Sequence, residues 1–452
     1  MSQALEQLAA DAVARAKSWG ADAAEVTVSE GEEFSANIRM REIESVKEAG
    51  SRGAGIRVLI GKHTGSSYTS DLTREGIDTM VRSAIDLARF TSEDPHAGLP
   101  DAADLGRYDS PLNLYDATLE SMASEEKIAQ AKRAEIAALD FDPRIKNSEG
   151  AGFSSHLSGR VFANSLGFVG SYRTSSCGLS VVPVASSNGE TSKMERDYWH
   201  TAARSAAGLE SPEQVGRIAA QRALRRLGAR KVSTQKVPII FEPRTARSLL
   251  GDLFDAINGS SIYRNASFLA GKLGEQVAAE GITVIDDATI PGLFGSSPFD
   301  DEGVASRRTV VIENGVLRNY LLNSYAARKL GMKSTGNASR GITGNAGIGP
   351  GNFFLQAGSD TPQSILKGVK SGLYVSELIG GGADTVTGDY SSGASGMWIE
   401  NGELAYPVSE ITIAGNMKQM LMNLAKIGAD LEFRTSVAAP TILIGEMTVS
   451  GQ

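Results

Sequence analysis

The chain has 452 residues, of which 41% are hydrophobic and 22% charged, and its formal net charge is −8. This length and balance are typical of a globular protein with two or three domains, and they exclude a disordered chain. No stretch approaches the ~20 apolar residues that span a bilayer, so a membrane protein built from helices is excluded too. The acidic balance argues against nucleic acid as a direct partner.

Cysteine content indicates the compartment. Cys177 is the single cysteine of the sequence, so no intrachain disulfide can form, as is usual in a reducing compartment. The N-terminus lacks the basic start and apolar run of a signal peptide. We therefore expect a cytoplasmic protein.

The first 90 residues predict a helix, four strands and a second helix. Apolar residues recur at helical spacing at each end of this region, and Gly20 follows the first helix as a stop signal. The alternating segments between the helices are AEVTVSE, FSANIRMREIESVKE, GAGIRVLIG and SSYTSD. The region is therefore predicted to be an α-β-β-β-β-α unit.

The middle of the chain contains a long connection at about residues 91–111, then a helix from about 124 to 139. Short alternating pieces between residues 150 and 198 predict further strands. Ser211-Pro212-Glu213-Gln214 has the pattern of a capping box and starts a helix that is expected to end near Gly228. The basic residues close to that end are interpreted as favourable contacts with the helix dipole; they are Arg222, Arg225, Arg226, Arg230 and Lys231.

Fifty glycines against fourteen prolines indicate many tight turns and close backbone contacts. Asn314-Gly315 and Asn401-Gly402 each lie between alternating apolar residues, which predicts two hairpins. We predict an α+β fold with a domain boundary near residue 232. Residues 1–231 would form an N-terminal α/β domain with an antiparallel sheet, and residues 232–452 a Gly-rich, mostly antiparallel β domain with a few helices.

A search for catalytic groups finds no self-contained set. None of the four histidines is followed by glutamate, so the H-E-x-x-H zinc motif is missing. Cys177 lies in Ser-rich β sequence and is interpreted as a small core residue. The clusters Asp286-Asp287 and Asp300-Asp301-Glu302 could hold a hard cation, but their spacing is not that of a calcium loop, and solvated turn residues are the favoured interpretation.

Long segments of the C-terminal half resemble the TldD/PmbA family. They include PFDDEGVASRRTVVIENGVLRNYLLNSYAARKLGMKSTGNASRG, GNFFLQAG and LYVSELIGGGADTVTGDYSSGASGMWIENGE. The N-terminal segment RGAGIRVLIGKHTGSSYTSDLT is similar to the same family, so the resemblance covers nearly the whole chain. Length and the phrase GDYSSGASGMWIENGE place it closer to the PmbA (TldE) branch than to TldD.

The resemblance implies a peptidase of two related subunits, in which the TldD-like chain holds zinc through an H-E-x-x-x-H helix and a later cysteine. The corresponding slot here begins at Gly251-Asp252 and ends at Ala256. Gly251 and Ala256 have no ligand atom, and Asp252 is too short to replace a glutamate base. We therefore expect no catalytic residue and no metal in this chain, with zinc in a TldD-like partner subunit.

A glycine run near the C-terminus is the candidate peptide site. Gly380-Gly381-Gly382 would let a foreign backbone come close, and an exposed strand edge can take an extended, unfolded peptide as one more strand. Asp384, Thr385, Ser391 and Ser392 complete this candidate site. The alternative is that these glycines only form bulges and tight turns inside the sheet.

Three hypotheses remain. In the first, the chain is an accessory subunit that forms a heterodimer with a TldD-like subunit and contributes to cleavage of unfolded peptides, an activity that the resemblance links to proteolysis, peptide-antibiotic maturation and antitoxin turnover. In the second, it is a metal-free, homodimeric peptide-binding or regulatory module. In the third, it is an autonomous metallopeptidase with Asp252, Asp255 and a distant histidine as ligands.

Overall fold

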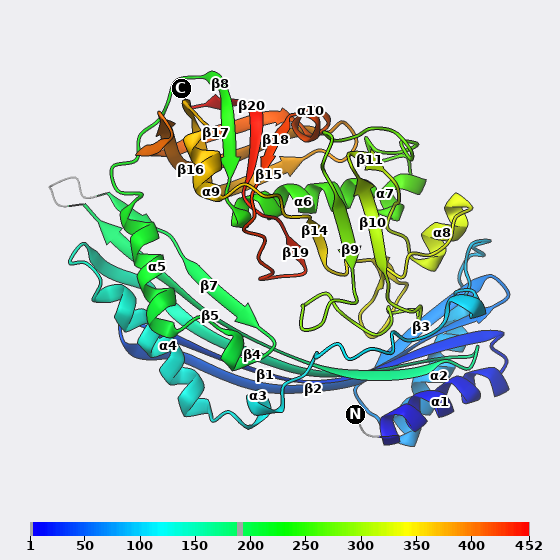
Figure 1. Cartoon of the computed structure of the whole chain (residues 1–452). Coiled ribbons are helices and arrows are strands. Elements are labelled where there is room, and N and C mark those ends of the chain that lie inside the picture. The colour runs from blue at the N-terminus through cyan, green and yellow to red at the C-terminus, as the bar shows by residue number, and fades with distance from the viewer. Residues whose placement is uncertain (1–2, 188–192, 452) are drawn as a thin grey trace.

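A long, curved antiparallel sheet forms the N-terminal half of the computed structural model, which describes residues 3–187 and 193–451 (Figure 1). Met1 and Ser2 of the N-terminal segment considered above lie outside the described residues. In the described part of the chain the strand order is β3-β2-β1-β4-β5-β6, and β7 also pairs with β5. The strands are β1 (Ala23–Arg39), β2 (Glu42–Ile60), β3 (His63–Thr69), β4 (Ile145–Asn164), β5 (Val169–Ser186), β6 (Met194–Arg196) and β7 (Trp199–Ala203).

The prediction of four strands between the first two helices was wrong, because the described chain has three. β1 continues through Gly31, which is paired with Ser51 on one side and Ser158 on the other. The turn falls instead at Met40-Arg41, where both residues have positive φ. The buried carboxylate of Glu135 accepts hydrogen bonds from the backbone N–H groups of Met40 (3.0 Å) and Arg41 (2.6 Å). A distant helix thus stabilises a turn that has no local glycine signal.

Helices cover one face of this sheet in two groups. At one end, α1 (Gln3–Ser18) and α2 (Arg74–Ala88) pack on residues such as Val26 and Val28. At the other, α4 (Ser124–Leu139) and α5 (Pro212–Leu224) pack on Phe34 and Ala36. Because side chains alternate along a strand, these even-numbered positions of β1 point to the same face. The short elements are η1 (Ala102–Asp104), α3 (Ala117–Ser121) and η2 (Ala206–Gly208).

The predicted start of α5 is confirmed by its cap. The Ser211 hydroxyl accepts a hydrogen bond from the backbone N–H of Gln214, which is one of the two hydrogen bonds of a capping box. The same helix ends at Leu224, before the expected Gly228, which instead takes a left-handed conformation in the following turn. The described helices include none that is long and apolar enough to cross a bilayer.

The C-terminal half is built around a ring of strands. In the described residues β17, β16, β15, β8 and β20 are neighbours in that order, and pairing of β20 with β17 closes the ring. A smaller sheet of order β11-β10-β9-β14-β19 lies beside it. Both predicted Asn-Gly hairpins are confirmed: Asn314 and Asn401 have φ of 48° and 51°. The strands are β8 (Gln235–Phe241), β9 (Val284–Asp287), β10 (Arg308–Glu313), β11 (Val316–Leu317), β12 (Ala338–Ser339), β13 (Gly347–Ile348), β14 (Phe353–Leu355), β15 (Ser371–Ala383), β16 (Asp389–Glu400), β17 (Glu403–Asn416), β18 (Leu424–Ile427), β19 (Val437–Ala438) and β20 (Ile442–Ser450).

The helix α6 crosses the space beneath this ring (Figure 1). Its apolar side, which includes Leu249, Leu250 and Leu253, packs into the main core of the C-terminal half. The α+β class with antiparallel sheets is therefore confirmed, whereas the domain boundary near residue 232 stays a prediction. The helices of this half are α6 (Pro243–Ile257), α7 (Gly259–Tyr263), α8 (Ser324–Leu330), α9 (Pro362–Lys367) and α10 (Met417–Met422).

The acidic clusters are buried, and their interpretation as solvated turn residues was wrong. Asp300 is 7% exposed and accepts backbone hydrogen bonds from Glu302, Val304 and Ala338. Burial raises the pKa of Asp286 to about 7 and the pKa of Asp300 to about 8. These carboxyl groups organise loops of the C-terminal half from the inside, which the sequence spacing does not reveal.

A buried ion triad joins the two halves. The Glu25 carboxylate of β1 accepts from Arg57 of β2 at 2.7 Å and also from Arg340 of the C-terminal half. All three side chains are at most 8% exposed. Burial tends to raise the pKa of Glu25, but the charges of Arg340 and Arg57 outweigh it and hold that pKa below its usual value. The triad is therefore ionised: removing Arg340 would leave Glu25 with Arg57 as its single cationic partner, and removing Glu25 would leave two buried guanidinium groups without their shared carboxylate.

Arg340→Met should lower the free energy of unfolding by about 3 kcal/mol, because a buried carboxylate loses a charged partner. Arg318→Met is the control, since its ion pair with Glu313 (3.1 Å) is about half exposed, and it should change stability by less than about 1 kcal/mol. Urea denaturation of both variants measures the difference. Equal effects would show that the triad does not stabilise the contact between the halves.

Candidate functional site

The predicted metal-motif slot lies on α6, and its residues point in different directions. An added Cβ at Gly251 would meet no atom within 4 Å, so this position faces open space. Ala256 is fully buried in the core. Five residues along a straight helix rotate the side chain by about 140°, which accounts for the difference. Neither residue has a side-chain atom that could bind a metal, and Ala256 is packed in the core.

Asp252 connects α6 to the glycine run on β15. Its carboxylate lies beside that run, because an added Cβ at Gly382 would lie 3.1 Å from Asp252 Oδ1. Burial raises the pKa of Asp252 to about 6, and the nearby Asp255 carboxylate adds to the effect. Burial, reinforced by the charge of Asp252, raises the pKa of Tyr390 as well. The structure therefore brings together the predicted metal-motif slot on α6 and the predicted glycine run on β15.

The glycine run forms a bulge. Gly380, Gly381 and Gly382 have φ of 62°, 74° and 130°, and the register of β15 with β16 shifts between Ile379 and Gly382. An added Cβ at Gly381 would lie 2.0 Å from the Ser391 carbonyl oxygen, so only glycine fits there. This geometry favours the alternative in which the glycines shape the sheet.

The other predicted peptide-site residues make internal contacts. The Asp384 carboxylate accepts from the backbone N–H groups of Val386 and Thr387, and the Thr385 carbonyl accepts from Phe268 N–H. The Ser392 hydroxyl donates to the Gly380 carbonyl at 2.7 Å, and Ser391 pairs with Gly382 across the bulge. A role of these residues in binding peptide stays a prediction.

The edge of β15 is only partly open. β15 pairs with β8 over Leu373–Val375, and beyond that point α6 runs beside it. The Thr245 hydroxyl donates to the Val375 carbonyl at 3.1 Å, and the Asp252 carboxylate lies beside Gly382 at the far end. Between these two contacts Ile379 is 58% exposed, and Gly380 and Gly381 are exposed as well. A short stretch of strand edge therefore faces solvent beside α6.

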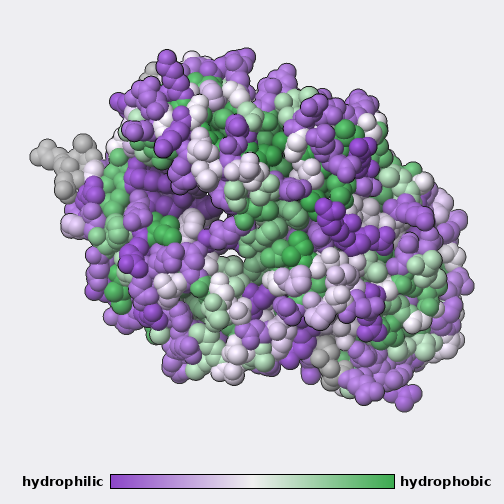
Figure 2. All heavy atoms as spheres, in the orientation of Figure 1, coloured by the Kyte–Doolittle hydropathy of each residue, from purple (hydrophilic) through white to green (hydrophobic). Residues whose placement is uncertain are grey.

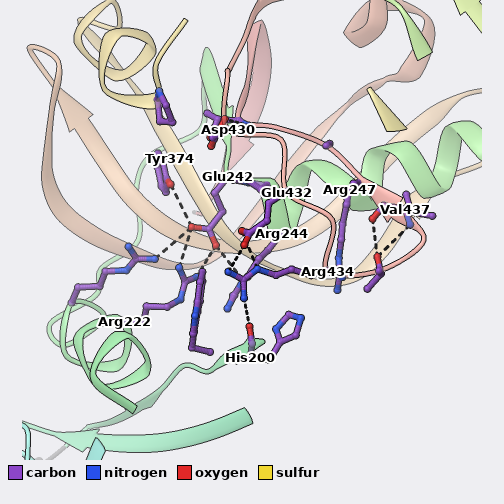
Figure 3. Close-up of a pocket in the computed structure, with 18 residues that line it drawn as sticks. His200, Arg222, Glu242, Arg244, Arg247, Tyr374, Asp430, Glu432, Arg434 and Val437 are labelled. Atoms are coloured by element: carbon purple, nitrogen blue, oxygen red, sulfur yellow. Dashed lines mark hydrogen bonds and ion pairs between the residues drawn. The ribbon is translucent and has the colours of Figure 1, made fainter. Parts of the chain in front are cut away.

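A pocket of about 350 Å³ lies between the two halves, next to the N-terminus of α6 (Figure 3). The surface is hollowed between the halves in the space-filling view as well (Figure 2). The walls come from β7, the end of α5, the start of α6, β15 and the loop before β19. The charged and aromatic side chains that line the pocket are Trp199, His200, Arg222, Arg225, Glu242, Arg244, Arg247, Tyr374, Asp430, Glu432 and Arg434.

Arg222 in the last turn of α5 and Arg225 at its C-cap lie at the helix end, as the sequence interpretation has it, and both also line this pocket. Arg222 is 8% exposed and donates to Glu242 at 2.6 Å and 3.2 Å. Arg222 and Arg244 both donate to the Ser376 carbonyl of β15, at 3.5 Å and 3.1 Å. The ion pairs thus connect α5 of the first half with α6 and β15 of the second.

Sequence reasoning missed this pocket. Arg244 and Arg247 lie three residues apart at the start of α6 and therefore share one side of the helix, which was the available signal. Burial, and then the positive charges of Arg434, Arg247 and Arg244, lower the pKa of His200 to about 4. The imidazole is therefore neutral at pH 7.

The residues of the α6 slot do not fit a zinc site. Zinc in proteins is held by imidazole, thiolate and carboxylate groups that converge on one point. Within residues 3–187 and 193–451 no group of three or more His, Cys, Asp or Glu side chains is close enough to hold a metal ion. Cys177, interpreted as a core residue, is indeed buried in the first half, and burial raises the pKa of its thiol to about 11.

Gly381→Ala should destabilise the protein more than Gly380→Ala. Both substitutions place a side chain at positive φ, which costs about 1–2 kcal/mol, but only alanine at 381 collides with the Ser391 carbonyl, an overpacking effect of about 1–3 kcal/mol. Thermal unfolding of the two variants measures the difference. Equal losses of stability in the two variants would mean that the backbone of the bulge moves enough to accommodate a side chain at either position.

Asp252→Asn should raise the melting temperature at pH 8 and change it little at pH 4.5. The pKa of Asp252 is about 6 in the folded chain against an ordinary value of 3.8, so its protonated form stabilises the fold at low pH and this contribution is lost as the pH rises through 6. The exposed Asp86→Asn on α2 serves as the control. A pH-independent effect of Asp252→Asn would contradict the raised pKa.

Comparisons with known proteins agree along the chain. Family models match at residues 24–88 (PmbA/TldA metallopeptidase domain 1), 117–227 (central domain) and 234–451 (C-terminal domain). Metalloprotease PmbA of Escherichia coli O157:H7 is 42% identical over 95% of this chain and 93% of its own length. The Metalloprotease PmbA homolog of Haemophilus influenzae is 39% identical over 99% of this chain and 96% of its own length.

Solved structures show the same fold. A proposed modulator of DNA gyrase from Bacteroides thetaiotaomicron has a TM-score of 0.92 at 28% identity, with both chains fully covered. TldE from Thermococcus kodakarensis has a TM-score of 0.87 at 22% identity, covering 98% of this chain and 100% of its own, and supports the fold alone. Three matched domains and the identity to PmbA over nearly the full length show that this chain belongs to the PmbA/TldD metallopeptidase family, on its PmbA branch.

Proposed function

We propose that this chain is the metal-less subunit of a TldD/PmbA-type zinc metallopeptidase and forms a heterodimer with a TldD-like subunit. The observation that carries the proposal is the α6 slot, where Gly251 offers no ligand atom and Ala256 is buried in the core. The relatives named metalloproteases support the peptide-hydrolase context. Zinc and the water that it activates would then come from the partner subunit.

The chain would contribute a peptide-binding surface, and no catalytic group, to the shared peptidase. An unfolded peptide could meet the exposed edge at Ile379–Gly381, where backbone groups recognise a chain without reading its side chains. Because this stretch is short and α6 contacts both of its ends, the peptide would need further contacts elsewhere. We place this activity in the cytoplasm, in keeping with a sequence that contains a single cysteine.

A reconstitution experiment tests the proposal. The purified chain, a TldD-like subunit and their mixture are assayed for hydrolysis of an unfolded peptide, with zinc measured by mass spectrometry on the same samples. We expect no cleavage and no stoichiometric zinc for this chain alone, and at least about tenfold faster cleavage by the mixture than by the TldD-like subunit, which corresponds to about 1.4 kcal/mol in the barrier.

Two outcomes would contradict the proposal. One tightly bound zinc per chain together with peptide cleavage would favour the autonomous metallopeptidase. No association with the TldD-like subunit and no effect on its rate would instead leave the homodimeric peptide-binding module as the better hypothesis. Size-exclusion chromatography of the mixture separates these cases.

A further inference from the structure

The outer edge of β2 is open along the first part of this strand. β1 pairs with β2 from Glu42 to Leu59, whereas β3 pairs on the other side of β2 only from Ala54 to Ile60. β3 thus covers only the end of the sheet on which α1 and α2 pack (Figure 1). In the described part of the chain no further strand pairs with β2. A row of backbone N–H and C=O groups before Ala54 can therefore pair with another strand.

The open stretch Glu42–Arg52 is exposed on both faces of the sheet. A strand with one face packed on a core normally alternates between buried and exposed residues. Val46 is paired with Ala36 of β1, which is buried in the core beside α4, and yet Val46 is 47% exposed. Ile43 is paired with the buried Ile38 of β1 and is 55% exposed. The helix therefore covers β1 and leaves an apolar margin on β2.

The alternative interpretation is a solvated edge whose charges prevent association. Lysine and other charged residues often protect edge strands, and Lys47 and Glu48 lie in the middle of this stretch. However, Lys47 forms an ion pair at 3.5 Å with Glu33 of the neighbouring β1, so its charge is partly compensated within the sheet. Two large, exposed apolar side chains on the same face, Ile43 and Val46, do not protect an edge. They favour a surface that another strand covers.

The open stretch has the right length for a second copy of itself. In an antiparallel pair, residues at equal distances on either side of the centre face each other, so two-fold symmetry places one residue opposite its own copy. With Val46 at the centre, the turn Met40-Arg41 of the second copy would lie near Arg52, just before β3 begins to pair at Ala54. With Ala49 at the centre, the second copy would extend past Ala54 and collide with β3.

The side chains favour the same centre. With Lys47 or Glu48 at the centre, two like charges would lie directly opposite each other, which destabilises a pair of strands. Val46 at the centre instead brings two apolar side chains together. Ile43 of each copy lies on the same face of the sheet and would extend this contact. Lys47 would then face the uncharged Ser45 of the second copy.

We propose that two copies of this chain associate through antiparallel pairing of their β2 edges, with Val46 opposite Val46 of the second copy. The two curved sheets would join into one continuous sheet, and the exposed side chains of Ile43 and Val46 would be covered. The backbone groups of the open stretch would gain hydrogen-bond partners. This inference goes beyond the proposed function, because it concerns association of the chain with itself and requires neither zinc nor a TldD-like subunit.

Charge substitutions at the centre test the inference. Sedimentation of the pure full-length chain should show a species of twice the chain mass of 47.6 kDa. Val46→Glu and Val46→Lys, each measured alone, should weaken the dimer about tenfold, because like charges would replace the apolar contact at the two-fold axis. An equal mixture of the two variants should recover the dimer, because opposite charges would then face each other.

Val386→Glu is the matched control. Val386 lies on the loop between β15 and β16 and is 57% exposed, so the same substitution there should leave dimerisation unchanged. Val46 is exposed to a similar extent, and all variants should therefore fold. Their melting temperatures verify this.

Three results would overturn the inference: a wild-type chain that stays monomeric at about 100 μM, equal dimerisation of Val46→Glu and Val386→Glu, or a mixture of Val46→Glu and Val46→Lys that dimerises no better than either variant alone. A monomeric chain whose Val46→Glu variant fails to bind the TldD-like subunit would assign the edge to that subunit instead. Sedimentation uses this chain alone, so its failure is distinguishable from failure of the reconstitution.

Discussion

The buried carboxylate of Glu242 is the contact on which the arrangement of the two halves and the site depends. It lies at the turn from β8 to α6, is 5% exposed, and accepts hydrogen bonds from Arg222 of the first half. Tyr374 of β15 lies 3.4 Å away on the other side. A carboxyl group at this depth needs hydrogen-bond and ion-pair partners, and those of Glu242 hold α5, α6 and β15 at one point. The Glu25 triad makes a comparable connection between β1 and the loop of Arg340.

The direction of α6 follows from this anchor. The helix starts at the arginine pocket, runs beside the edge of β15, and meets the glycine bulge through Asp252. Its apolar side is fixed by the core, so the residues that face outward are determined by the helical period. Where the resemblance places zinc ligands in TldD-like chains, this helix presents Gly251 to open space and turns Ala256 into the core.

The exposed stretch Ile379–Gly381 of β15 lies beside α6. A strand edge offers backbone groups, which can pair with an extended chain. Under the proposed function, this edge is where the chain would meet an unfolded peptide, although the chain itself would supply no metal ligand.

The sequence by itself determined the elements with local signals: the amphipathic helices, the capping box at Ser211, both Asn-Gly hairpins, the family, and the missing ligands at Gly251 and Ala256. The helices, the cap and the hairpins follow from periodicity and φ preferences, which neighbouring residues encode. The family and the missing ligands follow from the resemblance of long sequence segments. Only the tertiary structure decided the turn at Met40-Arg41, which the distant Glu135 stabilises, and the burial of Asp286 and Asp300. The arginine pocket also belongs to this second group, because its side chains come from both halves of the chain and no local pattern specifies which distant charges will meet.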